Sequence, residues 1–154
     1  MKPSPQSGFT LVETLVGMFL LAVVMIGLAL MITVSMQTGQ RTRVDTEATM
    51  LAQWELEQML AQPLSVTTFT DANGNTSSLA PGGSPLVNGA IDFSQAPVTS
   101  YCAILTSTTG GQYELRWNVQ TLSDGSKQFI VAARKNSRQR FLMPPINLAT
   151  RLGR

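Results

Sequence analysis

The chain has 154 residues, enough for one domain or for a small domain with an appendage. Only 13% of its residues are charged, against about 25% in an average soluble domain. The 27 residues from Thr14 to Gln40 carry no charged side chain, which excludes a wholly soluble globular protein. Histidine is absent and Cys102 is the single cysteine, which excludes His-based acid–base catalysis, a Ser-His-Asp triad, most zinc sites and an intramolecular disulfide. The composition therefore argues against an enzyme, and we assign no catalytic, metal-binding or cofactor-binding residue.

The net charge of +2 conceals an uneven distribution. Residues 134–154 contain six basic side chains and no acidic one, namely Arg134, Lys135, Arg138, Arg140, Arg151 and Arg154. A solvated, partly flexible end explains this basic tail most simply, and a patch for anionic lipid or nucleic acid is the alternative. The tail has one aromatic residue, Phe141, so its support for nucleic-acid binding is weak.

An apolar segment follows the first residues of the chain. Leu15 to Ile32 are 18 consecutive apolar or glycine residues. As a helix they span about 27 Å, close to the ~30 Å hydrocarbon core of a bilayer. A cleaved secretory signal is disfavoured, because the run is too long and residues 32–36 lack a small-residue cleavage site. The segment therefore predicts a membrane-spanning helix.

The residues before this segment form a specific motif, Gly8-Phe9-Thr10-Leu11-Val12-Glu13. A carboxylate at the edge of a membrane segment is costly unless it faces water or has a partner. The motif resembles the prepilin signature of type IV pilins and of type II secretion pseudopilins. The resemblance implies cleavage between Gly8 and Phe9 by a prepilin peptidase, N-methylation of Phe9, and Glu13 as the carboxylate of filament assembly. An ordinary signal-anchor helix with an incidental glutamate is the alternative.

Elementary electrostatics suggests how this motif could act in filament assembly. Cleavage would expose the Phe9 α-amine at the start of an apolar helix, where an unpaired amine and an unpaired Glu13 carboxylate are both costly. Pairing the amine of a subunit already in a filament with the carboxylate of an incoming subunit would set the axial register. The apolar helices would then exchange lipid contacts for close packing with one another.

The helical pattern continues after the apolar segment. Apolar residues recur at spacings of three and four, namely Val44, Ala48, Leu51, Ala52, Leu56, Met59 and Leu60. Glu55 falls within this apolar arc, and Gly39 is a weak point that costs about 1 kcal/mol relative to alanine. We predict one helix from Phe9 to Ala61, whose first half faces lipid or partners and whose second half needs a globular cover.

Residues 62–100 are rich in proline and glycine, which predicts a long loop with a short strand near Ile91–Phe93. Asp71, Asn73 and Asn75 occupy positions 1, 3 and 5 of a calcium-like loop. Position 12 would be Gly82 and supplies no carboxylate, so a turn is the preferred interpretation.

Strand patterns begin at Tyr101. Apolar and polar residues alternate from Tyr113 to Val119, and a second apolar set runs from Phe129 to Ala133. Ser123-Asp124-Gly125 suits a hairpin loop with Gly125 in the left-handed conformation. We expect Tyr113 and Trp117 in the core, with the pairs Leu122–Ser126, Val119–Phe129, Trp117–Val131 and Leu115–Ala133.

The expected fold class is therefore α+β, with a long N-terminal helix, apolar then amphipathic, packed against a small antiparallel C-terminal sheet. The tail lacks helical or strand periodicity and contains Pro144-Pro145. The expected segments are 1–8 (prepilin leader), 9–36 (hydrophobic transmembrane and assembly helix), 37–61 (amphipathic helix continuation), 62–100 (loop region), 101–134 (antiparallel sheet) and 135–154 (basic C-terminal tail).

The order of elements, the segment 48–60 and the Tyr113–Trp117 hairpin resemble minor pilins of the PilV type, with type II secretion pseudopilins of the I kind as the close rival. The apolar helix lacks the proline of many major pilins, and Cys102 alone cannot close their C-terminal disulfide. Both departures favour a minor subunit over an abundant shaft subunit.

The resemblance implies a minor type IV pilin that is inserted once through the inner membrane as a prepilin and then joins or primes a pilus. The implied partners are a prepilin peptidase, an inner-membrane assembly platform, and other major and minor pilins that contact the apolar helix. The alternatives are a minor pseudopilin of a type II secretion system and a membrane-anchored binding module for DNA uptake or adhesion. No cofactor is expected.

Overall fold

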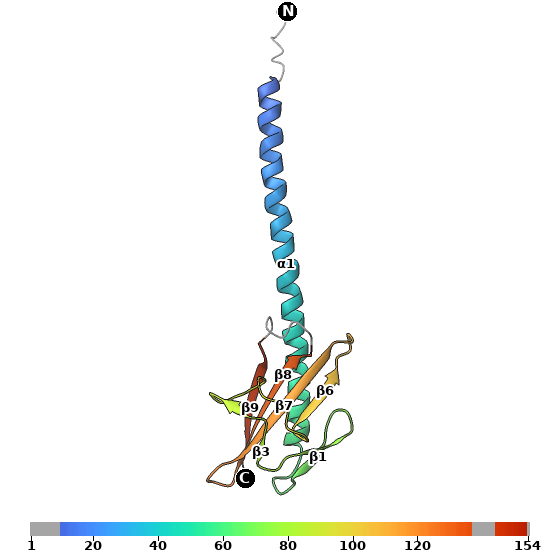
Figure 1. The fold of residues 1–154 in the computed structure, drawn as a ribbon, viewed down its shortest axis with the longest axis vertical. Helices are drawn as coiled ribbons and strands as arrows, with labels where there is room; N and C mark the ends of the chain where they lie inside the picture. Colours follow the sequence, from blue (N-terminus) through green and yellow to red (C-terminus); the bar gives the residue numbers. More distant parts are fainter. Residues whose placement is uncertain (1–9, 137–143, 154) are drawn as a thin grey trace, which may run out of the picture. The chain divides into compact units, whose positions relative to one another are not determined.

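The computed structural model describes residues 10–136 and 144–153. The chain divides into two compact units, Met1–Gln40 and Arg41–Arg154. One helix, α1 (Leu11–Leu60), contributes to both units, against predicted ends at Phe9 and Ala61. The strands lie in the second unit, where residues 41–60 of α1 pack against an antiparallel sheet (Figure 1). The fold class is α+β, as predicted.

The described part of the second unit contains one main sheet and two small hairpins. The hairpins are formed by β1 (Thr68–Thr70) with β2 (Thr76–Ser78), and by β4 (Leu86–Val87) with β5 (Ala90–Ile91). The main sheet has the order β3-β7-β8-β9, and β6 pairs with β7 on the same side as β3. Its strands are β3 (Gly82–Gly83), β6 (Cys102–Thr106), β7 (Gln112–Thr121), β8 (Lys127–Lys135) and β9 (Ile146–Leu152).

The β7–β8 hairpin has the predicted register. Val119 pairs with Phe129, Trp117 with Val131 and Leu115 with Ala133. The backbone N–H of Leu122 donates to the carbonyl of Ser126, and Gly125 has the expected positive φ of 78°. The hairpin was predictable because its turn residues and its two apolar sets favour the same register.

The core lies between the sheet and the second part of α1. The predicted helical face supplies Val44, Ala48, Ala52 and Met59 as buried residues, and the other apolar members of the face pack around them. Their partners are the alternating residues of the hairpin, namely Tyr113, Leu115, Trp117, Val119, Phe129, Val131 and Ala133.

Trp117 is at the centre of this core and is fully buried, as predicted. Its ring meets that of Phe69 edge-on at a centroid distance of 5.7 Å, and its indole N–H donates to the Ser78 carbonyl at 3.0 Å. Tyr113 is also fully buried, which confirms its expected place in the core. The tryptophan therefore joins the β1–β2 hairpin to the main sheet.

The opposite face of the sheet is also covered, which its alternating polar residues did not predict. Glu114 and Arg116 are buried, and a second apolar cluster joins Ile91 to residues of β8. The guanidinium groups of Arg116 and Arg134 lie over the Phe93 ring at 4.7 and 4.3 Å. Charged residues can lie under this cover because they are paired with one another.

Glu114 is the centre of that ion cluster. Its carboxylate accepts hydrogen bonds from Arg116 at 2.6 Å and from Arg134 at 2.9 Å. Burial works against its charge, but the hydrogen bonds from the two arginines outweigh burial and hold the pKa of Glu114 below its usual value.

Two expectations about irregular regions were wrong. Residues 62–100 contain five short strands, β1 to β5, rather than a loop with a single strand, although β5 does lie at Ile91, close to the strand expected near Ile91–Phe93. The tail contains β9, which pairs with β8 from Ile146–Ala133 to Leu152–Lys127. Residues 146–152 do alternate between half-buried and exposed, and the two prolines precede the strand, where they remove no ladder hydrogen bond.

The turn at Asp71 is confirmed as a turn. One carboxylate oxygen accepts hydrogen bonds from the backbone N–H groups of Asn73 at 3.0 Å and Asn75 at 2.8 Å. The other oxygen accepts from the Ser77 hydroxyl at 3.2 Å. The carboxylate that suggested a calcium-like loop therefore closes the β1–β2 hairpin.

Glu47 joins α1 to the turn between β6 and β7. Its carboxylate accepts hydrogen bonds from Ser107, Thr109 and Tyr113, each at 2.9 Å, and it pairs with Arg43 one turn earlier at 3.2 Å. These bonds, that of Thr109 above all, lower the pKa of Glu47 to about 2. The contact fixes the start of the packed part of the helix on the sheet.

Glu55 is the opposite case, a fully buried carboxylate in the apolar arc. One oxygen accepts from the backbone N–H of Ala72 at 3.2 Å, and the other has no hydrogen-bond partner among the described residues. Burial raises the pKa of Glu55 to about 7, and the nearby charge of Asp71 adds to the rise. The interruption in the helical stripe therefore marks an energetically costly group.

Candidate functional site

The candidate site is the first turn of α1. The carbonyl of Thr10 accepts hydrogen bonds from the backbone N–H groups of Glu13 at 3.0 Å and Thr14 at 3.2 Å. The Thr10 hydroxyl also accepts from the N–H of Glu13 at 3.3 Å. Thr10 is therefore the N-cap of the helix and Glu13 its third residue. The Thr-x-x-Glu spacing of a capping box is a sequence signal for this start, one residue or two later than the expected start at Phe9.

The Glu13 side chain has no hydrogen bond or ion pair among the described residues. It is surrounded in sequence by exposed apolar side chains, since Leu11 is 78% exposed and Leu15 63%. Its negative charge suits the positive end of the helix dipole, an interaction worth about 0.3–1 kcal/mol. The carboxylate is thus positioned to accept a cationic partner. Gly8 and Phe9, the expected cleavage residues, lie outside the described residues.

The surface of α1 beyond this turn is apolar all round. Its large apolar side chains from Leu11 to Met36 are more than half exposed, and its most apolar window has a mean hydropathy of 2.9. Within the described residues, α1 is the one helix long and apolar enough to cross a membrane. An all-round apolar helix without protein cover fits a lipid environment or a bundle of similar helices.

Three threonine hydroxyls on this part of the helix are satisfied locally. Thr14, Thr33 and Thr38 donate to the backbone carbonyls of Leu11, Ala29 and Val34 at 2.8, 2.9 and 3.0 Å. Such bonds let a polar side chain enter hydrocarbon without an unsatisfied donor. These three threonines are therefore compatible with a bilayer, as is the length of the segment.

Residues 3–29 match the family model of the prokaryotic N-terminal methylation motif. The match includes Gly8, Phe9 and Glu13 and ends inside the apolar part of α1. It supports the type IV pilin and pseudopilin family. The motif indicates a type IV pilin-like or pseudopilin precursor, and with the apolar helix it is consistent with a membrane-anchored prepilin. Neither a curated protein nor a solved structure matches the chain.

The basic tail is partly neutralised within the second unit. The structure describes Arg134, Lys135 and Arg151 among its six basic residues. Arg134 pairs with Glu114, and Arg151 pairs with Asp124 in the β7–β8 loop. These two arginines stabilise contacts of β8 and β9, so they add little to a nucleic-acid surface.

Proposed function

We propose that this chain is a minor type IV pilin. It is inserted once through the inner membrane as a prepilin, cleaved between Gly8 and Phe9 by a prepilin peptidase, and N-methylated at Phe9. An inner-membrane assembly platform then moves it into the pilus or into the complex that primes one, next to other major and minor pilins. The observation that carries the proposal is Glu13, which lies within the matched motif in the first turn of an exposed apolar helix.

The proposed chemistry is charge pairing between subunits. Cleavage creates an α-amine at Phe9, and the Glu13 carboxylate has no partner among the described residues. In an apolar bundle the two charges lower each other's desolvation cost when they pair. Pairing between neighbouring subunits would select one axial register, while the apolar helix surfaces supply most of the contact area.

The second unit supports a minor rather than an abundant subunit. Cys102 is free, so its strands are held by packing and hydrogen bonds without the disulfide of many major pilins. The helix continues from Leu11 to Leu60 without a proline. The free cysteine and the helix without a proline both differ from the pattern of many major pilins, and both therefore favour a minor subunit.

Glu13→Gln tests the proposal because it removes the charge and keeps the shape. We expect the variant to insert and to be cleaved, since a long apolar run tolerates either side chain near its end. We expect its amount in sheared pili to fall at least about tenfold, as expected when an ion pair worth more than about 1.4 kcal/mol is lost. Glu57→Gln, the same change at an exposed helical position, is the matched control. Incorporation of Glu13→Gln at the wild-type level would contradict the pairing mechanism.

The pseudopilin alternative makes a different prediction about machinery. A minor pilin requires the pilus platform, so deletion of that platform should remove the chain from sheared filaments. If the chain stayed in sheared filaments after that deletion, and was lost from them after deletion of a type II secretion platform, it would be a pseudopilin instead.

A further inference from the structure

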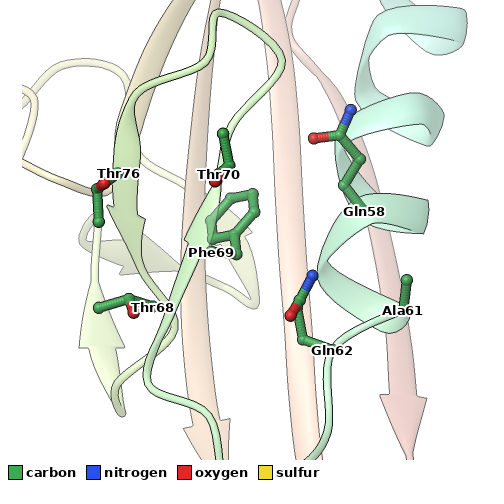
Figure 2. A pocket seen from close by; sticks show the side chains of 7 residues that line it. All are labelled: Gln58, Ala61, Gln62, Thr68, Phe69, Thr70 and Thr76. Carbon is green, nitrogen blue, oxygen red and sulfur yellow. The ribbon is translucent and has the colours of Figure 1, made fainter.

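The second unit contains a cavity of about 510 Å³ between the end of α1 and the β1–β2 hairpin. It is lined by Gln58, Ala61, Gln62, Thr68, Phe69, Thr70 and Thr76. Figure 2 shows Gln58 and Gln62 on the helix, across the cavity from the threonines of the hairpin. Its volume lies within the range of about 300–1,000 Å³ that is usual for small-molecule sites.

The lining of this cavity is polar but uncharged. It has two amides and three hydroxyls, and none of its residues is ionisable. The side chains of Gln62 and of the three threonines have no hydrogen-bond partner among the described residues. Amides and hydroxyls both donate and accept hydrogen bonds, so this wall can serve a ligand that does both.

An exposed tryptophan lies beside the cavity. Trp54 is 48% exposed and precedes Gln58 by one helical turn. With the Gln58 amide oriented to satisfy both neighbours, its nitrogen donates to the Thr70 carbonyl at 3.0 Å and its oxygen accepts from the Trp54 indole at 3.3 Å. Positions 54, 58, 61 and 62 share one face of the helix. A flat aromatic side chain therefore contacts Gln58, one of the residues that line the cavity.

We propose that this cavity and Trp54 bind a neutral oligosaccharide. Sugar hydroxyls donate and accept hydrogen bonds as the lining does, and the C–H face of a sugar ring can stack on an indole. An apolar ligand would leave the amides and hydroxyls unpaired, because most apolar ligands require a mainly hydrophobic lining. A charged ligand would lose hydration without gaining an opposite charge. The cavity lies within the second unit, and the first turn of α1 belongs to the first unit. Oligosaccharide binding therefore does not depend on the proposed role of Glu13 in the filament.

The test uses the full chain in lipid nanodiscs free of sugar-based detergent. Maltotriose, cellotriose and triacetylchitotriose are titrated separately, followed by calorimetry and by tryptophan fluorescence. The chain has two tryptophans, and the buried Trp117 contacts Phe69 of the lining, so a fluorescence change is assigned to Trp54 only if it is lost in Trp54→Ala. We expect saturable binding of at least one trisaccharide, and no saturable binding of the acidic trigalacturonic acid.

Variants then locate the binding. Trp54→Ala should remove it, and Gln62→Ala should weaken it about tenfold, as expected for a lost hydrogen bond. Gln53→Ala removes an exposed amide that does not line the cavity and should have no effect. If Gln62→Ala lowers the unfolding temperature, Thr70→Val, which removes a hydroxyl of the lining and keeps the side-chain shape, replaces it. Failure of all three sugars to bind, equal binding of the acidic sugar, or binding unchanged in Trp54→Ala would overturn the proposal.

Discussion

Residues 11–40 and 41–60 belong to the same helix but have opposite surfaces. In the first part, apolar side chains such as Leu21 are exposed in every direction. In the second part, apolar residues such as Ala52 and Met59 form one stripe and are buried under the sheet. The difference shows that the distribution of apolar residues around a helix indicates what must cover it. An apolar stripe needs one protein surface, whereas an all-round apolar surface needs lipid or similar helices.

Three glutamates of α1 lie in three different environments. Glu13 has no partner among the described residues, Glu47 accepts hydrogen bonds from three hydroxyls, and Glu55 is buried with one unpaired oxygen. Glu13 is therefore available for a partner, Glu47 makes a structural contact, and burial of Glu55 destabilises the fold. Substitutions at these positions and in the core can test each assignment.

The largest expected effect is that of Trp117→Ala. A fragment starting at Gln37 should fold as a monomer, because the core lies within the unit Arg41–Arg154. The substitution removes a fully buried ring and leaves the Ser78 carbonyl without its donor, so it should cost about 3–5 kcal/mol. That is a large share of the roughly 5–15 kcal/mol typical of a domain, so thermal unfolding should show severe destabilisation.

Trp54→Ala is the matched control, since Trp54 is about half exposed. Its midpoint should remain much closer to that of the wild type. If the two variants unfolded at the same temperature, Trp117 would not be the central core residue.

Deletion of residues 141–154 should have the next effect. It removes β9, whose Ile146, Leu148 and Leu152 are half-buried against the core, and it exposes the edge of β8. Partial burial of three large apolar side chains contributes on the order of 3 kcal/mol. Urea unfolding of the fragment with and without these residues measures the loss. An unchanged midpoint would show that β9 contributes nothing to stability.

Glu55→Gln should have a smaller effect of opposite sign. The raised pKa of Glu55, about 7, means that the unfolded carboxyl ionises before the folded one as pH rises. Stability attributable to this group should therefore fall between about pH 4.5 and 7 and stay constant above that range. The neutral variant avoids the buried charge but leaves a buried amide, so we expect it to gain about 1–2 kcal/mol at pH 8.

Thermal unfolding of wild type and variant from pH 4.5 to 8 tests this sign. The difference should be largest at pH 8 and shrink toward pH 4.5. Glu57→Gln, the same change at an exposed position of the same helix, is the matched control. A wild type that is more stable than Glu55→Gln at pH 8 would contradict the assignment.

Much of this structure was predictable where two local patterns agreed. The register from Leu115 to Ala133 followed from alternation on both strands and from a turn that needs Gly125. The helix was predictable because its apolar residues keep helical spacing from Val44 to Leu60.

The parts that depend on distant contacts were not predictable. The sequence did not predict β9, because Pro144-Pro145 argued against regular structure in the tail. The strand also depends on pairing with β8, which local sequence does not reveal. The cover over Glu114 and Arg116 requires Phe93, which lies far away in the sequence. The N-cap Thr10 could have been found from its spacing to Glu13.

The central claim is that the first eight residues are a leader and that the functional chain begins at Phe9. Mass spectrometry of the N-terminal peptide of the mature protein, isolated from membranes and from sheared filaments, tests it most directly. We expect the peptide to begin at Phe9 with one methyl group on its amine. Gly8→Val should remain uncleaved, because the peptidase requires a residue without a bulky side chain at this position. A mature chain that retains Met1–Gly8, or a Gly8→Val variant that still begins at Phe9, would contradict the account.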